Sequence, residues 1–423
     1  MQYEDSAEFA ARLDLEDPLA GFRERFEFPD ARGGRSSIYL CGHSLGLQPR
    51  LAADYVRQEL SEWARRGVEG HFDAKRPWVS YHRNATAPLA ALTGAKPSEV
   101  VAMNTLTVNL HVLMTSFYRP DAQRRKILIE STAFPSDRYA AASQIRLHGH
   151  HPQRDLLEWR PRDDRLLHMD DLAALLEREG DQTALLLLPG VQYYSGQALD
   201  MAGICALARR HGCKVGFDLA HAIGNVALEL HEWGPDFAAW CSYKYLNGGP
   251  GAIAGAFVHE RHLVPGEVEQ LHGWWGNDAA TRFEMRDEFD PAPGADQWQL
   301  SCPPVLSFAP VLAALEIFGE AGLSRLIDKS KRLTGYLEWL IRRRFADRIG
   351  ILTPAEARGC QLSLVITDAG LDARGLFDEL VKLNVIGDWR EPDVIRLAPA
   401  PLYNSFSDVL ECADRLQQAI DTA

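Results

Sequence analysis

The chain's most informative segment reads GFDLAHAIGN at 216–225 and DFAAWCSYKYLNGGPGAIAG at 236–255. Asp218 ends one short apolar run, and Lys244 follows a second one just before Asn247 and a series of glycines. Short runs that are apolar on both faces are typical of buried parallel strands. Ligands of an open α/β sheet gather at the carboxyl ends of its strands. The segment therefore predicts such a sheet, with a carboxylate and an amine facing one crevice.

The neighbouring sequence extends this pattern over most of the chain. Helical stretches, DDLAALLERE at 170–179 and MAGICALARRHG at 201–212, alternate with short apolar runs. The runs are KILIE at 126–130, TALLLLP at 183–189, KVGFDL at 214–219, FAAWCS at 237–242 and AIAGAFV at 252–258. Strands that alternate with helices indicate an α/β fold with a mostly parallel sheet.

Changes in composition divide the 423 residues into three parts. Residues 1–66 are predicted to form an N-terminal arm and a helix at 51–66, and 67–304 the large α/β domain. Two long helices are predicted at 305–322 and 323–345. With the alternating strands and helices that follow, they would form a smaller α+β domain over 305–423.

Charge and cysteine usage restrict the class of protein. The net charge is −13 and the basic residues are dispersed, which disfavours nucleic acid or an anionic membrane as a partner. The acidic N-terminus does not resemble a signal peptide, and the apolar runs are too short to cross a bilayer. Seven cysteines without a C-x-x-C pair indicate free thiols. We expect a cytoplasmic protein with a small-molecule substrate.

Lys244 and Asp218 have the chemistry that pyridoxal 5'-phosphate requires. A lysine among small residues suits a Schiff base with an aldehyde cofactor, and a carboxylate suits the protonated ring nitrogen. His221, three residues after Asp218, would stack on a planar ring or bond its substituents. The alternatives are a lysine that extends from a strand end, an aspartate that caps a helix and a core histidine.

Two further segments offer a phosphate site. Thr105 and Thr107 precede an apolar helical run, where hydroxyls and free N–H groups bind anions, although ordinary helix caps look the same. Phe134, Ser136 and Asp137 follow the strand at 126–130 and add an aromatic face and polar groups. No P-loop or dinucleotide fingerprint competes. The histidines of HGHHP at 148–152 lack companions at zinc-like spacing, so we predict no metal site.

These segments, taken in order, resemble the kynureninase family, whose members have the pyridoxal-phosphate fold type I of aspartate aminotransferase. The resemblance covers nearly the whole chain. Its motifs are GHSLGLQP (42–49), GHFDAKRPW (70–78), NTLTVNLH (104–111), FPSD (134–137), GFDLAHAIGN (216–225), WCSYKYLNGGPG (240–251), GWWG (273–276), RGCQLS (358–363) and IRLAPAPLYNSF (395–406).

The resemblance implies a role for each matching position. Lys244 would bond the cofactor aldehyde, Asp218 would pair with the ring nitrogen and Tyr243 would relay a proton. The residues implied around the phosphate and the ring are Leu106, Thr107, Phe134, Ser136, Asp137, His221, Tyr243, Trp274 and Cys302. The residues implied at the substrate are Arg396 for the α-carboxylate and Ser44 and His71 toward the aromatic ring.

The implied reaction is hydrolysis of the Cβ–Cγ bond of L-kynurenine or its 3-hydroxy derivative, in tryptophan catabolism or NAD biosynthesis. The family is homodimeric, with each active site built from both subunits. The chain departs from the family pattern at His43, Pro189 and Cys302, which concerns substrate preference more than chemistry.

A cysteine desulfurase or aminotransferase of the same fold is the alternative enzyme. Desulfurases typically carry histidine where Tyr243 stands, and they need a reactive cysteine in a mobile loop. A catalytically silent binding protein would be expected to have lost Lys244 or Asp218.

Overall fold

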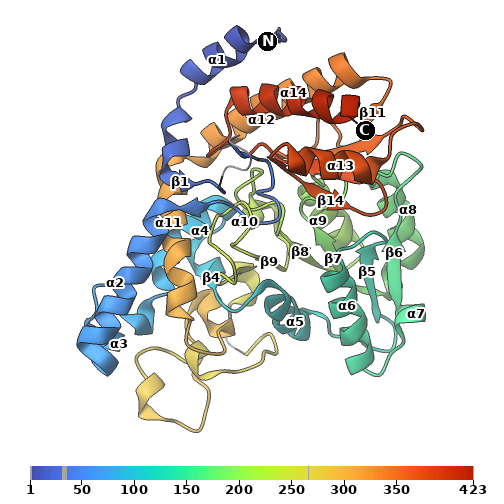
Figure 1. Cartoon of the computed structure of the whole chain (residues 1–423). Helices are drawn as coiled ribbons and strands as arrows, with labels where there is room; N and C mark the ends of the chain where they lie inside the picture. Colours follow the sequence, from blue (N-terminus) through green and yellow to red (C-terminus); the bar gives the residue numbers. More distant parts are fainter. Residues whose placement is uncertain (1, 31–35, 265, 423) are drawn as a thin grey trace.

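The computed structural model describes residues 2–30, 36–264 and 266–422 (Figure 1). Its central element is a seven-stranded sheet. In spatial order the strands are β4 (Val100–Ala102), β10 (Gly255–Val258), β9 (Phe237–Trp240), β8 (Lys214–Asp218), β7 (Thr183–Pro189), β5 (Lys126–Glu130) and β6 (Leu156–Trp159). The strands from β9 to β6 pair in parallel, whereas β10 is antiparallel to both of its neighbours. The predicted mostly parallel sheet is confirmed.

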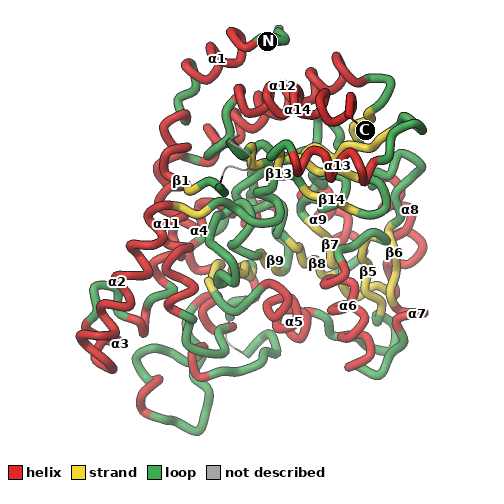
Figure 2. Tube along the Cα trace, in the orientation of Figure 1, coloured by secondary structure: helices red, strands yellow, loops and turns green. Residues whose placement is uncertain are grey.

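Alternate side chains of the strands enter two different hydrophobic cores. In β5, Ile127 and Ile129 pack with one core and Leu128 packs with the other. Because successive side chains of a strand point to opposite faces, the two cores lie on opposite faces of the sheet. Figure 2 shows the helices arranged around the strands. The first face is covered by α5 (Leu106–Phe117) and α6 (Pro135–Leu147), and the other by α4 (Arg83–Thr93), α8 (Met169–Glu179), α9 (Met201–Arg210) and α11 (Val305–Ala321).

The C-terminal part has its own sheet and core. Its four strands are antiparallel, in the order β11 (Ile349–Ile351), β12 (Leu362–Ile366), β15 (Val394–Leu397) and β14 (Asp388–Arg390). Four helices contribute to this core: α1 (Ala7–Leu15), α12 (Leu323–Phe345), α13 (Ala373–Lys382) and α14 (Phe406–Thr422). The N-terminal helix α1 packs against α14, so the first and last helices of the chain lie together in this layer (Figure 1).

The described part of the segment 16–49 contains the 3-10 helix η1 (Ala20–Arg25) and short strands. β1 (Phe26–Glu27) pairs with β3 (Gln48–Pro49), and β2 (Ile38–Tyr39) pairs in parallel with β13 (Val385–Ile386). The short α-helices of the described residues are α3 (Gly70–Asp73), α7 (Pro152–Asp155) and α10 (Leu230–Trp233). The 3-10 helices include η7 (Trp274–Gly276), η8 (Arg282–Glu284) and η9 (Gly294–Trp298).

The predicted division at 66/67 and 304/305 stays a prediction. α2 (Arg50–Arg66) ends at Gly67, as its sequence indicates, and it packs along α11.

Within the described ranges, no single helix is long and apolar enough to cross a membrane. α11 and α12 meet that length and composition only as a pair, bent by 81°.

Candidate active site

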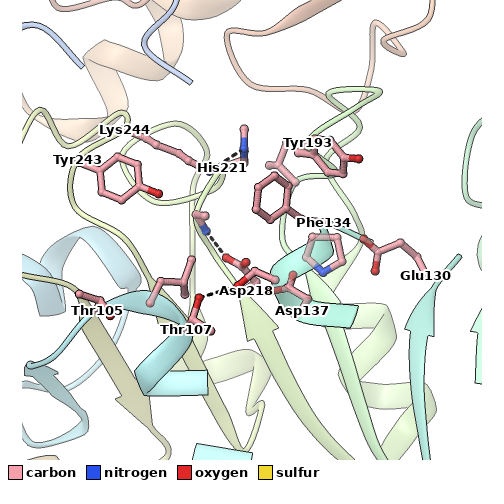
Figure 3. Close-up of a pocket in the computed structure, with 15 residues that line it drawn as sticks. Thr105, Thr107, Glu130, Phe134, Asp137, Tyr193, Asp218, His221, Tyr243 and Lys244 are labelled. Carbon is pink, nitrogen blue, oxygen red and sulfur yellow. Dashed lines mark hydrogen bonds between the residues drawn. The ribbon is translucent and has the colours of Figure 1, made fainter. Parts of the chain in front are cut away.

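A cavity opens where the carboxyl ends of β5, β7 and β8 meet the first turns of α5 and α6 (Figure 3). The cavity volume that the centres of water molecules can occupy is about 160 Å³, whereas a single bound water requires only ~10–15 Å³ of such volume. The cavity therefore accepts a small organic molecule. The residues that line it are Thr105, Leu106, Thr107, Glu130, Phe134, Ser136, Asp137, Pro189, Val191, Tyr193, Asp218, Ala220, His221, Tyr243 and Lys244.

Lys244 extends into the cavity from the loop after β9. Its Nζ lies 3.0 Å from Nε2 of His221 and 5.9 Å from the centre of the Phe134 ring. Burial and the nearby Lys244 charge hold the pKa of His221 well below its usual range. The imidazole is therefore neutral, and its Nε2 accepts a hydrogen bond from the lysine. That leaves the proton on Nδ1, which is buried without a partner among the described residues.

Three carboxyl groups lie together at the floor of the cavity. Asp218 ends β8, Glu130 ends β5 and Asp137 lies in the first turn of α6 (Figure 3). Burial raises the pKa of all three, and the charges of Asp218 and Glu130 raise that of Asp137 further. Lys244 and the Ala220 N–H, 2.7 Å from Asp218 Oδ1, oppose the shift of Asp218. Burial therefore favours the protonated form most strongly at Asp137, whereas Lys244 and the Ala220 N–H favour the carboxylate form at Asp218.

The starts of two helices converge on one side of the cavity. Thr107 is in the first turn of α5 and Ser136 in that of α6, and their hydroxyl oxygens are 2.6 Å apart. Neither Thr105 nor Phe134, the cap residues, closes its helix with a side chain. Free N–H groups and hydroxyls at paired helix starts form an anion site.

Tyr243 joins the cavity wall to the loop at 42–46. Its backbone carbonyl accepts a hydrogen bond of 2.8 Å from the Gly46 N–H. Burial, together with the neighbouring Cys241 and Asp218, raises the pKa of the Tyr243 phenol. The hydroxyl therefore remains protonated across the neutral range and serves as a hydrogen-bond donor.

Two of the predicted substrate residues lie directly behind this wall. The Arg396 Nη1 donates to the carbonyl of Tyr193, a lining residue, over 2.7 Å. Its Nη2 is 3.5 Å from Ser44 Oγ. Neither Arg396 nor Ser44 is itself among the residues that line the cavity.

The other three predicted residues gather at a different place. His71 contacts Phe72, Phe72 contacts Phe283, and Phe283 contacts Trp274, with ring centres 5.4–6.4 Å apart. Trp274 Nε1 donates to the Arg282 carbonyl, and the Arg282 charge acts on the exposed Cys302. We call His71, Phe72, Trp274, Phe283 and Cys302 the aromatic cluster. None of its members lines the cavity.

The residues at the cavity fit pyridoxal phosphate. An amine, a carboxyl group, an aromatic ring and a two-helix anion site match its aldehyde, ring nitrogen, ring face and phosphate. Two buried atoms of the site, His221 Nδ1 and Asp137 Oδ1, have no hydrogen-bond partner among the described residues. Since buried polar atoms are normally hydrogen-bonded, this indicates that a polar group of a ligand completes the site.

Several site residues were not predicted from the sequence. Glu130, Val191, Tyr193 and Ala220 line the cavity, and Asp388 contacts Arg396. Of these residues, only Glu130 could have been recognised from the sequence, because it ends an apolar strand run as Asp218 does. Tyr193 lies in a loop whose position depends on tertiary packing.

The fold and these residues define a fold type I pyridoxal-phosphate enzyme. Solved structures of that fold superimpose on the chain. The cystine C–S lyase C-DES, with glycine covalently linked to its cofactor, matches with a TM-score of 0.78 at 18% identity, over 93% of this chain and 98% of that one. A cysteine desulfurase from Escherichia coli gives 0.77 at 18% identity, over 96% and 98%. At this identity the likeness establishes the fold alone.

Sequence relatives are more specific. The kynureninase of Myxococcus xanthus is 51% identical over 98% of this chain and 97% of its own, and that of Koribacter versatilis is 50% identical over the same shares. The class-V aminotransferase family model matches residues 38–368, and the kynureninase C-terminal domain model matches 326–416. This chain belongs to the kynureninase family. It is a hydrolase that acts on a carbon–carbon bond and uses pyridoxal phosphate.

Proposed function

We propose that the chain hydrolyses the Cβ–Cγ bond of L-kynurenine, giving anthranilate and L-alanine, and that it also accepts 3-hydroxy-L-kynurenine. The observation that carries the proposal is that Lys244 and the Asp218 carboxyl group line one cavity, in a chain half identical to named kynureninases. The enzyme would act in the cytoplasm, in tryptophan breakdown or on the route to NAD.

The cofactor would be held by residues of this chain at three of its parts: the phosphate, the ring face and the ring nitrogen. Thr107 and Ser136 would bind its phosphate with the helix starts, and the Phe134 ring would cover its ring face. Asp218 would pair with the ring nitrogen and keep it protonated, while burial favours the protonated, uncharged form of Asp137. Bound in this way, pyridoxal phosphate supplies an electron-accepting ring that stabilises negative charge at the substrate carbons.

Proton movement would be divided between two neighbouring residues. Lys244 Nζ would take the proton from the substrate α-carbon, while the neutral His221 ring, 3.0 Å away, orients the amine. Tyr243, adjacent in sequence and on the same cavity wall, would give a proton to the β-carbon after water has added to the γ-carbonyl and the Cβ–Cγ bond has broken. Arg396 would bind the α-carboxylate through its planar guanidinium.

The site would be completed by a second copy of the chain. Phe72, Trp274 and Phe283 of the aromatic cluster have 59%, 48% and 50% of their surface exposed, and exposed aromatic patches mark interfaces. The cluster also holds His71, Trp274 and Cys302, three residues that the family pattern assigns to the active site but that do not line this subunit's cavity. A homodimer in which each cluster faces the partner's cavity accounts for both facts.

The first test is turnover of both substrates by the purified protein and by Lys244→Ala. We expect the parent to release anthranilate from L-kynurenine. We expect Lys244→Ala to lose at least about 10³-fold in kcat, because the α-carbon would lack its base and the cofactor its covalent anchor. Lys214→Ala is the matched control, since Lys214 begins β8 and pairs with Asp236 at 3.1 Å, outside the cavity. Near-parent turnover by Lys244→Ala would remove the proposal.

A further inference from the structure

Asp388 is the centre of a charged group just behind the cavity wall. It lies on β14 directly across from Arg396 on β15. Its Oδ1 is 2.9 Å from Arg396 Nη2 and 3.3 Å from Arg396 Nε. The same carboxylate is 3.0 Å from Arg390 Nε and accepts a hydrogen bond of 2.5 Å from Ser44 Oγ. One acidic side chain thus joins two guanidinium groups and a serine.

The charges of this group do not balance. Arg390 and Arg396 contribute two positive charges and Asp388 one negative charge. The Arg396 side chain is 1% exposed and that of Asp388 is 13% exposed, whereas that of Arg390 is 35% exposed. Water therefore screens Arg390 in part but reaches little of the Arg396 charge. A buried excess of one positive charge favours a ligand with one carboxylate. The substrate's α-carboxylate supplies that charge.

The hydrogen-bond geometry also leaves room for this ligand. Asp388 accepts a hydrogen bond from Arg396 Nε, and the Tyr193 carbonyl accepts one from Arg396 Nη1. A guanidinium has five N–H donors in a fixed plane. Nη2 faces Asp388 Oδ1 at 2.9 Å and Ser44 Oγ at 3.5 Å, so the donor that remains for a second carboxylate is the other hydrogen of Nη1. Because the plane is rigid, the partner on one side determines where the other donors point.

We propose that Asp388 is a positioning residue that fixes the Arg396 guanidinium, and with it Ser44, in the orientation that binds the substrate's α-carboxylate. The inference rests on the proposed role of Arg396. Asp388 itself does not touch the substrate, and its effect is transmitted through Arg396.

A metal ion at this place fits the contacts less well. Donor atoms of Cys41, His43 and Asp388 lie within 4.8 Å of one another, which is close enough for a common ligand. However, both oxygens of Asp388 already accept from the arginines and Ser44. The adjacent guanidinium charges would repel a cation.

The test is Asp388→Asn in the holoenzyme, which keeps the shape but removes the charge. We expect KM for L-kynurenine and the dissociation constant of the product L-alanine, read from cofactor absorbance, to rise about 10- to 100-fold. We expect kcat to stay within about threefold and cofactor affinity to stay unchanged, because Asp388 is remote from the reacting carbons. A merely structural role would lower the melting temperature and cofactor affinity without this selective effect on KM, and that result overturns the proposal.

Two further variants distinguish the position of the Asp388 carboxylate from its charge, and a selective effect on substrate binding from general destabilisation of the protein. Asp388→Glu keeps the charge but moves it by one methylene, so KM should still rise, and parent-like KM would overturn a positioning role. Asp393→Asn is the control. Asp393 lies between β14 and β15, in the same hairpin as Asp388, but it pairs with Arg165 at 2.9 Å and not with Arg396. Failure of the parent to cleave kynurenine would refute the proposed function, whereas parent activity with an unchanged KM in Asp388→Asn refutes only this inference.

Discussion

Tyr243 has a protonated phenol at the cavity wall, next in sequence to Lys244. We expect Tyr243→Phe to bind the cofactor normally but to lower kcat about 10²-fold or more, since one general acid is lost. If proton delivery to the β-carbon is the slowed step, anthranilate leaves before alanine forms. Rapid-quench kinetics should then detect a burst of one anthranilate for each active site.

A tyrosine that only bonds the phosphate gives a different result. Tyr243→Phe would then weaken cofactor binding and recover parent kinetics, without a burst, at saturating pyridoxal phosphate. That outcome would contradict a proton-transfer role.

Glu130 makes stability depend on pH in a defined direction. Burial raises its pKa from 4.5 to about 8 in the folded protein. Between those values the unfolded chain loses this proton and the native protein keeps it, so the free energy of unfolding falls as pH rises. The stabilisation is complete below pH 4.5 and is lost through about pH 8.

Glu130→Gln, which cannot ionise, should remove this contribution. In urea unfolding of the cofactor-free protein at pH 5.5 and 7.5, the parent should lose about 2 kcal/mol more than the variant over the interval. The difference reports Glu130 together with its electrostatic coupling to Asp137 and Asp218, whereas the effect of His221, which is present in both proteins, cancels. Glu158→Gln on the adjacent β6 is the control. Equal slopes for parent and Glu130→Gln would show that Glu130 is ionised in the native protein.

Secondary-structure elements were predicted from the sequence where their pattern is local. The strands at 126–130 and 183–189 and the helix at 323–345 have the predicted bounds, because apolar runs and helical spacing report burial directly. Lys244 and Asp218 could be placed at one cavity for the same reason, since parallel strands end at one edge of the sheet.

Contacts between distant elements could not be predicted in this way. Gly46 packs so closely on the Lys244 loop that a Cβ atom there would lie 2.3 Å from the Lys244 carbonyl oxygen. The sequence shows a glycine in a turn but not which loop it meets. Similarly, Asp388 faces Arg396 only through the register of β14 and β15, which spacing along the chain does not specify.

Over the whole chain, most of the residues that the family pattern assigns to the active site fall into two separate groups. Lys244, Asp218 and their neighbours line the cavity, and His71, Trp274 and Cys302 belong to the exposed aromatic cluster. A symmetric dimer has the same surface on both subunits, so each cluster can serve the other subunit's cavity. Under that arrangement the Lys244 and Trp274 of one active site come from different chains.

Mixing two inactive variants tests this arrangement. A Lys244→Ala chain and a His71→Ala/Trp274→Ala chain should each be inactive alone. In a mixed dimer, one site collects both defects and the other site is intact. After random subunit exchange, half of the dimers are mixed and half of their sites are intact, so about a quarter of the parent activity should return. If each chain builds its own site, every site retains a defect and no activity returns. Sedimentation at the assay concentration verifies that the variants are dimers, because a monomeric parent with full activity would by itself contradict the shared site.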